Sequence, residues 1–179
     1  MKIGEAAPDF SVVDAGGKTR SLKEFAGKWV VLEWYNKDCP FVKKHYGSQN
    51  MQKLQSKYTG QGIVWLSVNS SAKGKQGYLD AAATLANAKE AGLAATAVLL
   101  DTDGKMGRAY DAKVTPHMFV INPESKVVYA GAIDDNDSAN PEVIATSKNF
   151  VDLALTAATT GKAVTVSSSK PYGCAVKYE

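Results

Sequence analysis

The chain has 179 residues, of which 45% are hydrophobic and 22% are charged. A chain of this size can bury a full core and falls within the range of one domain. The formal net charge of +3, from 21 basic and 18 acidic residues, is too small to indicate a nucleic acid or an anionic membrane surface as partner. We therefore expect one domain over residues 1–179 that binds neither nucleic acid nor membrane.

The first strands lie before residue 36. Residues 9–14 alternate apolar and polar side chains, residues 16–18 turn the chain, and residues 19–22 return, which predicts a β-hairpin. The capping-box spacing from Ser21 to Glu24 predicts a short helix that ends near Gly27. The nearly continuous apolar and aromatic run over 29–35 predicts a central strand covered on both faces.

Helices and strands then alternate. Pro40 starts a helix that is predicted to reach Gly60, with a bend at Gly47. Strands are predicted over 63–68 and 97–100, and an alanine-rich helix between them is expected to end at Gly92. This alternation predicts an α/β core with parallel strands.

The last third of the chain adds antiparallel strands. A helical turn over 105–110 leads to a strand over 118–121, and a turn at 122–125 returns a strand over 126–130. Asn140 is the expected N-cap of a last helix to about Thr160. The acidic stretch 134–137 is interpreted as a solvated loop, and the tail over 161–179 is expected to be irregular.

One of the two cysteines stands at a reactive position. Cys39 follows the central strand and precedes the first turn of the next helix. Reactive groups gather at that edge of an open α/β sheet, and a helix N-terminus favours a thiolate over a thiol. The alternative is a small buried plug under the helix, which the polar turn over 36–38 disfavours. We predict that Cys39 is a nucleophile.

The residues around Cys39 resemble a known family. The sequence DCPFVKKHY over 38–46, preceded by VLEWY over 31–35, is similar to the redoxin branch of the thioredoxin superfamily, which is related to the alkyl hydroperoxide reductase and thiol-specific antioxidant proteins. Residues 4–10, 114–117 and 170–178 fit the same branch. The resemblance implies a thioredoxin-like fold, in which helices flank a central mixed sheet and the β-hairpin is an N-terminal extension. It also implies a cis bond before Pro116, which would bring His117 close to Cys39.

Two departures from related patterns narrow the chemistry. A C-x-x-C pair would need a second cysteine at Asn36 or Val42, so a vicinal dithiol is excluded. The peroxiredoxin signature P-x-x-x-T/S-x-x-C would need proline in place of Leu32 and a hydroxyl residue in place of Asn36. Asn36 offers an amide N–H but no hydroxyl to orient a peroxide, which weakens the prediction of peroxidase activity.

Several further residues are candidates for the site. Cys174 lies beside Gly173 in the tail and suits a resolving thiol that condenses with a sulfenic acid at Cys39, with an unrelated tail cysteine as the alternative. His117 is the better of the two histidines to tune or protonate the thiol. Glu33 is either a proton acceptor beneath Cys39 or a strand-end carboxylate paired with a lysine. The predicted pocket walls are Glu33, Asn36, Thr115 and Pro116.

The leading function is a thiol-dependent oxidoreductase or antioxidant that reduces a peroxide or a disulfide at Cys39. An external thiol would be its reductant, and we expect no cofactor and no metal. One alternative is a copper-binding or copper-delivering module that resembles the Sco-type thioredoxin-fold proteins and uses Cys39 and His117, with or without Cys174. Another is a redox-inert binding domain.

The sequence leaves the compartment open. It has no apolar run of the ~18 residues that cross a bilayer, and residues 1–8 resemble the start of a mature domain. Relatives with this motif set suggest a periplasmic or secreted location, with a cytoplasmic one as the alternative.

Overall fold

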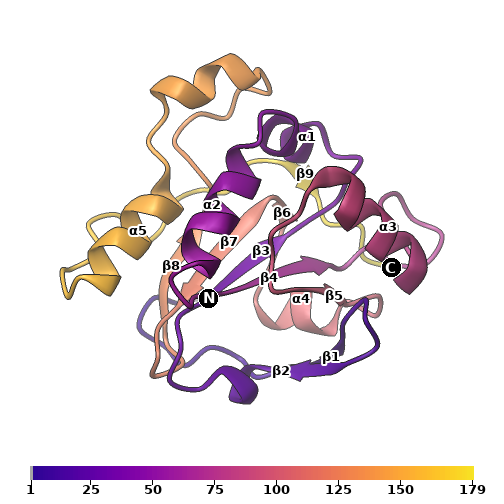
Figure 1. Ribbon diagram of the computed structural model, residues 1–179, viewed down its shortest axis with the longest axis horizontal. Helices are drawn as coiled ribbons and strands as arrows, with labels where there is room; N and C mark the ends of the chain where they lie inside the picture. Colours follow the sequence, from indigo (N-terminus) through magenta and orange to yellow (C-terminus); the bar gives the residue numbers. More distant parts are fainter. Residues whose placement is uncertain (1) are drawn as a thin grey trace.

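A five-stranded mixed sheet forms the middle of the protein in the computed structural model, which describes residues 2–179 (Figure 1). The strand order is β5-β4-β3-β7-β8. The parallel part comprises β3 (Val30–Trp34), β4 (Val64–Asn69) and β5 (Ala97–Leu100), and the antiparallel part adds β7 (His117–Ile121) and β8 (Val127–Gly131). The mixed sheet expected from the sequence is confirmed.

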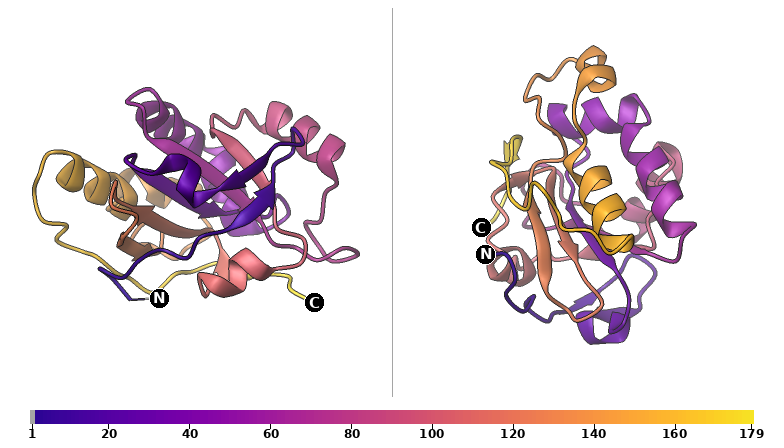
Figure 2. Two further views of the ribbon diagram at one scale, coloured as in Figure 1. Left: turned by 90° about the horizontal axis from the view of Figure 1, so that it is seen from below. Right: turned by 90° about the vertical axis from the view of Figure 1, so that its left-hand side faces the viewer.

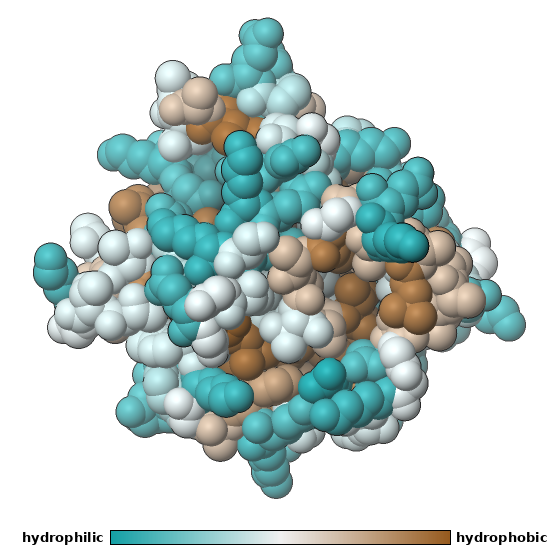
Figure 3. Space-filling view, in the orientation of Figure 1, coloured by the Kyte–Doolittle hydropathy of each residue, from teal (hydrophilic) through white to brown (hydrophobic). Residues whose placement is uncertain are grey.

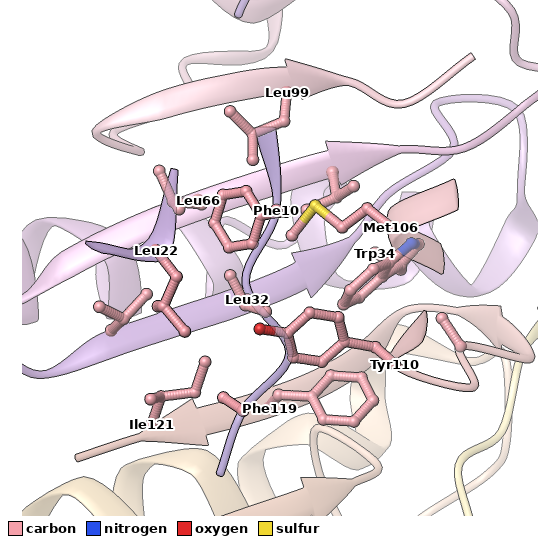
Figure 4. Packing of buried hydrophobic residues seen from close by; sticks show 14 of the residues in the cluster. Phe10, Leu22, Leu32, Trp34, Leu66, Leu99, Met106, Tyr110, Phe119 and Ile121 are labelled. Carbon is pink, nitrogen blue, oxygen red and sulfur yellow. The ribbon is translucent and has the colours of Figure 1, made fainter. Parts of the chain in front are cut away.

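Strand β3 lies at the centre of the sheet and is buried on both faces. It pairs in parallel with β4 and antiparallel with β7. Successive side chains of a strand point to opposite faces. Leu32 and Trp34 therefore enter one apolar cluster with Phe119, which Figure 4 shows, while Val31 enters the other with Cys39. The apolar run of the sequence, interrupted only by Glu33, is the signature of this two-sided burial.

Helices and the hairpin cover opposite faces of the sheet (Figure 2). The face that carries Cys39 packs against α1 (Pro40–Gly47), α2 (Asn50–Thr59) and α5 (Phe150–Thr159). The other face packs against residues of the hairpin β1–β2 (Ser11–Val13 and Thr19–Ser21), of the 3-10 turn η1 (Leu22–Phe25) and of α4 (Lys105–Ala109). The predicted hairpin thus forms with part of its surface on this core, to which its strands contribute Val12 while Phe10 and Leu22 lie beside them.

Helix α3 (Ala81–Ala91) is the least buried helix and ends at Gly92, as the sequence predicts. In Figure 3 apolar patches lie beside α3 on an otherwise largely hydrophilic face. Within residues 2–179 we find no helix with the length and apolar character that a membrane span needs.

Two predicted helices are each broken into two pieces. The helix expected over 40–60 stops at Gly47, and Gln49 takes a left-handed backbone conformation with φ of 63° before α2 begins. The helix expected from Asn140 is a 3-10 turn, η2 (Pro141–Thr146), followed by α5 with its own N-cap, Asn149. In both cases a polar side chain satisfies backbone groups locally and competes with an unbroken helix.

The C-terminal tail is more ordered than its sequence suggests. A short strand β9 (Cys174–Ala175) pairs antiparallel with β6 (Val114–Thr115), and Figure 1 shows it beside β6 and α1. Further upstream in the tail, Ser168 bridges Ala130 of β8. The expectation of an irregular segment over 161–179 is therefore wrong at these two places.

The two-sided burial of β3 leads to a stability prediction. Leu32 is fully buried, so Leu32→Ala leaves a cavity and is expected to lower the free energy of unfolding by about 2–5 kcal/mol. The same change at Leu85, which is 53% exposed on α3, is expected to cost less than about 0.5 kcal/mol. Urea unfolding followed by circular dichroism measures both, and equal losses would contradict this assignment of the core.

Candidate active site

Cys39 is the N-cap of α1, and Pro40 occupies the first helical position. The Cys39 carbonyl accepts the first helical hydrogen bond, from Lys43 N at 2.9 Å. The backbone of Cys39 is extended, so the chain turns from the loop after β3 into the helix at this residue. Its thiol is 0% exposed and donates to the Thr115 carbonyl oxygen at 3.3 Å. The thiol therefore lies at a helix N-terminus, as predicted, but is fully covered.

The cover comes from the tail. The Thr115–Pro116 peptide bond is cis, as the family resemblance implies. Strand β9 pairs with β6 so that Cys174 stands opposite Thr115, the residue that accepts the Cys39 thiol hydrogen. The two cysteines lie close enough for each to shift the pKa of the other, and both are free thiols. Two cysteines that are far apart in the sequence thus meet at one site.

The two thiols differ in acidity. Burial on its own would raise the pKa of Cys39, but the Cys174 thiol, Thr115 and the backbone N–H groups of Val42 and Cys174 outweigh it, so this pKa lies below its ordinary value. Burial, followed by hydrogen bonding and repulsion from Cys39, raises the pKa of Cys174 to about 11. Cys39 is therefore the more acidic of the two thiols.

Gly173 permits this close approach. Its φ is 152°, within the region that side chains rarely adopt, and a Cβ atom at this position would overlap the carbonyl of Thr115. Only glycine lets the tail backbone lie flat on the strand before Pro116. Gly173 is thus a structural requirement for placing Cys174 at Cys39.

Glu33 lies on the same face of β3 as Val31 and is completely buried. Its Oε1 accepts from Gln55 at 3.0 Å, Trp65 at 2.9 Å and Ser67 at 3.0 Å, and its Oε2 accepts from the Tyr46 hydroxyl at 2.5 Å. Burial raises the pKa of Glu33 in spite of these donors. The carboxylate is not paired with a lysine, which corrects that alternative, and its hydrogen bonds are to core residues rather than to Cys39.

His117 does not face Cys39, which corrects the sequence expectation. Its ring stacks on Phe119 with the ring centroids 4.7 Å apart, and its Nδ1 accepts from Lys113 N at 3.2 Å. Phe119 belongs to the cluster on the opposite face from Cys39, and side chains two apart on a strand share a face. Burial lowers the pKa of His117 to about 4, so the ring is neutral at pH 7.

Asn36 shapes the loop before Cys39. Its carbonyl accepts from Cys39 N at 3.1 Å, and its Oδ1 accepts from Asp38 N at 2.9 Å. Its buried side chain lies against Gly77, where a Cβ atom would overlap the amide. The hydrogen bonds of its side chain are thus directed at the loop and at Gln76, not at the thiol.

A polar cluster beside the thiols was missed by sequence reasoning. The Tyr172 hydroxyl contacts Asp134 at 2.5 Å, His45 at 3.0 Å and Lys44 at 3.2 Å. Asp134 is 3% exposed, so the interpretation of 134–137 as a solvated loop is wrong at its first residue. Two features of the sequence could have pointed to this cluster: the tail motif around Tyr172, and Lys44 next to His45 in the helix after Cys39. No local pattern connects either feature with Asp134.

The fold and the thiol at the N-terminus of α1, facing a cis-proline, define a protein of the thioredoxin-like class. The thioredoxin domain of a thiol-disulfide oxidoreductase from Bacteroides vulgatus superposes with a TM-score of 0.56 at 21% identity, over 73% of this chain and 88% of that one. The sequence matches the AhpC/TSA family over residues 3–130, and the chain belongs to this family.

Two further comparisons extend this finding. The chain is 33% identical over 125 residues to the thiol-disulfide oxidoreductase ResA of Bacillus subtilis, which is 70% of this chain and 64% of that protein, so it spans less than two thirds of this curated relative. The crystal structure of a hypothetical protein from Sinorhizobium meliloti 1021 superposes with a TM-score of 0.82 at 26% identity, over 100% of this chain and 96% of that one. This second likeness includes the tail, which the family match does not reach.

The raised pKa of Glu33 gives a pH-dependent prediction. Below its ordinary pKa of 4.5 the Glu33 carboxyl is protonated in both the folded and the unfolded state, and its contribution to stability is fully present. As the pH rises above 4.5, Glu33 ionises in the unfolded chain but stays protonated in the folded protein. The free energy of unfolding therefore falls until the pH reaches the raised pKa of the folded state. Glu33→Gln keeps three donors at Oε1 and removes this dependence.

We therefore expect the stability of wild type relative to Glu33→Gln to fall as the pH rises above about 4.5. Urea titrations of both proteins between pH 4 and 8 measure the difference. Parallel pH profiles would contradict the buried, charge-resisting state of Glu33.

The cover over Cys39 gives a prediction of accessibility. Gly173→Ala pushes the tail off β6, so we expect a bulky thiol reagent to label Cys39 about tenfold faster than in wild type, which corresponds to ~1.4 kcal/mol of lost closure. Gly161→Ala is the matched control, because φ there is also positive, at 74°, but the Cβ would enter open space. Peptide mass spectrometry reports the two cysteines separately, and unchanged labelling of Cys39 would argue against the tail as its cover.

Proposed function

We propose that the protein is a thiol–disulfide oxidoreductase in which Cys39 is the nucleophile and Cys174 the resolving thiol. The observation that carries this proposal is the register of β6 and β9, which sets Cys174 opposite Thr115 while Thr115 accepts the Cys39 hydrogen. The lowered pKa of Cys39 beside the raised pKa of Cys174 supports the order of attack. Asn36 belongs to the loop before Cys39, and Thr115 ends strand β6 before the cis Pro116, so these residues hold the pair from two sides.

The reaction has two exchanges. The Cys39 thiolate attacks one sulfur of a substrate disulfide, forms a mixed disulfide and releases the other half as a thiolate. Cys174, once deprotonated, attacks the Cys39 sulfur and releases the second half. The substrate gains two electrons, the protein keeps a Cys39–Cys174 disulfide, and an external thiol restores both cysteines.

The relatives support disulfide chemistry. The Bacillus subtilis relative is named a thiol-disulfide oxidoreductase, and the family match covers the strand, loop and helix that carry Cys39. Glu33 in this proposal is an acceptor for four core donors that holds β3 and the two helices together, and His117 takes no part at the sulfur.

Peroxide is the second candidate substrate. Cys39 is 0% exposed, so a molecule as small as a peroxide reaches it with less displacement of the tail than a protein disulfide requires. The Thr115 hydroxyl is buried beside the Cys39 sulfur and has no other hydrogen-bond partner within residues 2–179, so it is placed to orient an oxygen in place of the hydroxyl that Asn36 lacks. Peroxide would convert the thiolate to a sulfenic acid, and Cys174 would condense with it and release water.

The geometry does not favour the copper-binding alternative, because His117 lies away from the two cysteines. His117 stacks on Phe119 on the other face of the sheet and does not converge with Cys39 and Cys174. Within the part of the chain that the structure describes, no three His, Cys, Asp or Glu residues gather as a metal site. The redox-inert alternative gives no reason for the two cysteines of the chain to lie beside each other as free thiols.

A periplasmic or secreted location belongs to the same proposal. Protein disulfides form and persist in oxidising compartments, where an enzyme that exchanges them finds its substrates. Fractionation of the native cells, with Cys39 and Cys174 alkylated before lysis, would report both the location and the resting redox state.

The proposal predicts products that differ between variants. Wild type treated with a small disulfide is expected to end with a Cys39–Cys174 bond, and Cys174→Ser is expected to stop at a mixed disulfide on Cys39. Cys39→Ser is expected to react at the remaining thiol no faster than free cysteine, because burial, the largest cause of the raised pKa of Cys174, remains after Cys39 is removed. Stopped-flow kinetics with mass spectrometry of the products measures all three.

The same assay with hydrogen peroxide separates the two substrates. Faster loss of the Cys39 thiol with peroxide than with the disulfide would favour the peroxidase, and loss no faster than that of a free thiol would remove it. Wild type that stops at the mixed disulfide would remove the resolving role of Cys174.

A further inference from the structure

Three buried polar side chains meet at the hydroxyl of the half-buried Tyr172, two residues before Cys174, and we name the four the Tyr172 cluster: Lys44, His45, Asp134 and Tyr172. The Lys44 ammonium also donates to the Asn136 carbonyl at 2.8 Å and lies 5.0 Å from the centroid of the Tyr172 ring. His45 is 0% exposed, Lys44 2% and Asp134 3%. A cation, a carboxylate and an imidazole are thus withdrawn from water around one tyrosine hydroxyl.

The hydrogen bonds of the cluster have one consistent assignment. A tyrosine hydroxyl has one hydrogen to donate, which goes to Asp134 Oδ1 at 2.5 Å, and its oxygen then accepts from Lys44 and His45. Asn50 donates to the other ring nitrogen of His45 at 2.9 Å, so His45 is neutral with its hydrogen on Nε2. The Tyr172 hydroxyl is therefore used to its full capacity.

Stability alone is a weak reason for such a cluster. Taking a cation and a carboxylate out of water costs about as much as their attraction returns, and apolar residues of similar size serve a core as well. The best-attested use of buried ionic groups is to fix one register among several. The position of the cluster indicates that it fixes the register of the C-terminal tail against α1.

The cluster joins the two segments that carry the thiols. Lys44 and His45 belong to α1, the helix whose N-cap is Cys39. Tyr172 precedes Cys174 by two residues, and its ring also packs edge-on against Phe41, with the centroids 5.7 Å apart. Asp134 comes from the loop after β8 and holds the hydroxyl from the other side. One side chain therefore ties the tail to the helix just upstream of the second thiol.

We propose that Tyr172 is a positioning residue that sets the effective concentration of Cys174 at Cys39. The inference rests on the proposed function, because it matters only if Cys174 resolves a bond formed at Cys39. Tyr172 holds the tail at the helix, Gly173 lets the backbone lie on Thr115, and Cys174 arrives opposite the buried sulfur. Without the tyrosine hydroxyl the tail keeps the same cysteine but samples other registers.

The test uses oxidised glutathione as the probe and Tyr172→Phe as the variant. The Cys39 thiolate attacks glutathione disulfide, releasing one glutathione thiolate, and Cys174 then attacks the Cys39 sulfur and releases the second. Loss of a hydrogen bond to charged partners is expected to slow the second step by about tenfold or more. The first step is expected to be as fast as in wild type or faster, because the tail covers Cys39 less well. Rapid acid quenching with mass spectrometry measures both steps.

Tyr58→Phe is the matched control. The Tyr58 hydroxyl also donates to a carboxylate, that of Asp152, and is partly buried between α2 and α5. It is expected to lower stability without changing the closure step, which separates positioning from stability. If Tyr172→Phe does not fold, Asp134→Asn replaces it, because it keeps an acceptor for Tyr172 and only removes the charge, and a fall of about threefold is expected.

The outcomes are distinct. Closure in Tyr172→Phe at the wild-type rate, or equal slowing in Tyr58→Phe, would overturn the positioning role while leaving the proposed function intact. Absence of closure in wild type itself would overturn both the resolving role of Cys174 and this inference. Slow closure in Tyr172→Phe alone, with the first step preserved, supports it.

Discussion

The pairing of β9 with β6 is the constraint on which the site depends. It rests on a backbone contact at Gly173 that no other residue would allow, and on the cis turn at Pro116 that presents the Thr115 carbonyl. That carbonyl serves Cys39 by accepting its thiol hydrogen, and Thr115 serves Cys174 by pairing with it. The difference in acidity between the two thiols follows from this arrangement, because it buries both sulfurs and places them beside each other, so that Cys174 helps to lower the pKa of Cys39 while Cys39 helps to raise that of Cys174.

The polar interior of the protein is divided between two purposes. Glu33 of β3 accepts hydrogen bonds from four donors on two helices and the neighbouring strand, so this buried carboxyl group fixes how the helices pack on the sheet. At the edge of the sheet, Tyr172 gathers the groups that fix the tail. Both sites satisfy every strong donor that they bury, which is the condition under which a buried polar group is tolerated.

What the sequence predicts well is local. Pro40 after a polar turn, the apolar run of β3 and Gly92 at the end of α3 each carry their signal within a few residues, and the structure agrees at each. The cis bond at Pro116 came from family resemblance, not from composition. His117 was assigned to the wrong face because one residue of a strand does not reveal which face it takes. Cys174 is predicted from its motif, but the strand that carries it is not, because the register of the tail depends on Asp134 and Thr115, which are distant in sequence.

The second thiol lies outside the region that defines the family. The AhpC/TSA match ends at residue 130, in β8, while Cys174 and everything that positions it along the tail come later. In the proposed cycle, the thiol that resolves the bond at Cys39 therefore comes from a segment that the family match does not reach, while Cys39 itself lies within the match. Under that proposal a different C-terminal segment on the same core would leave the nucleophile in place and change only the step that follows, so proteins with one active-site motif need not share one reaction cycle.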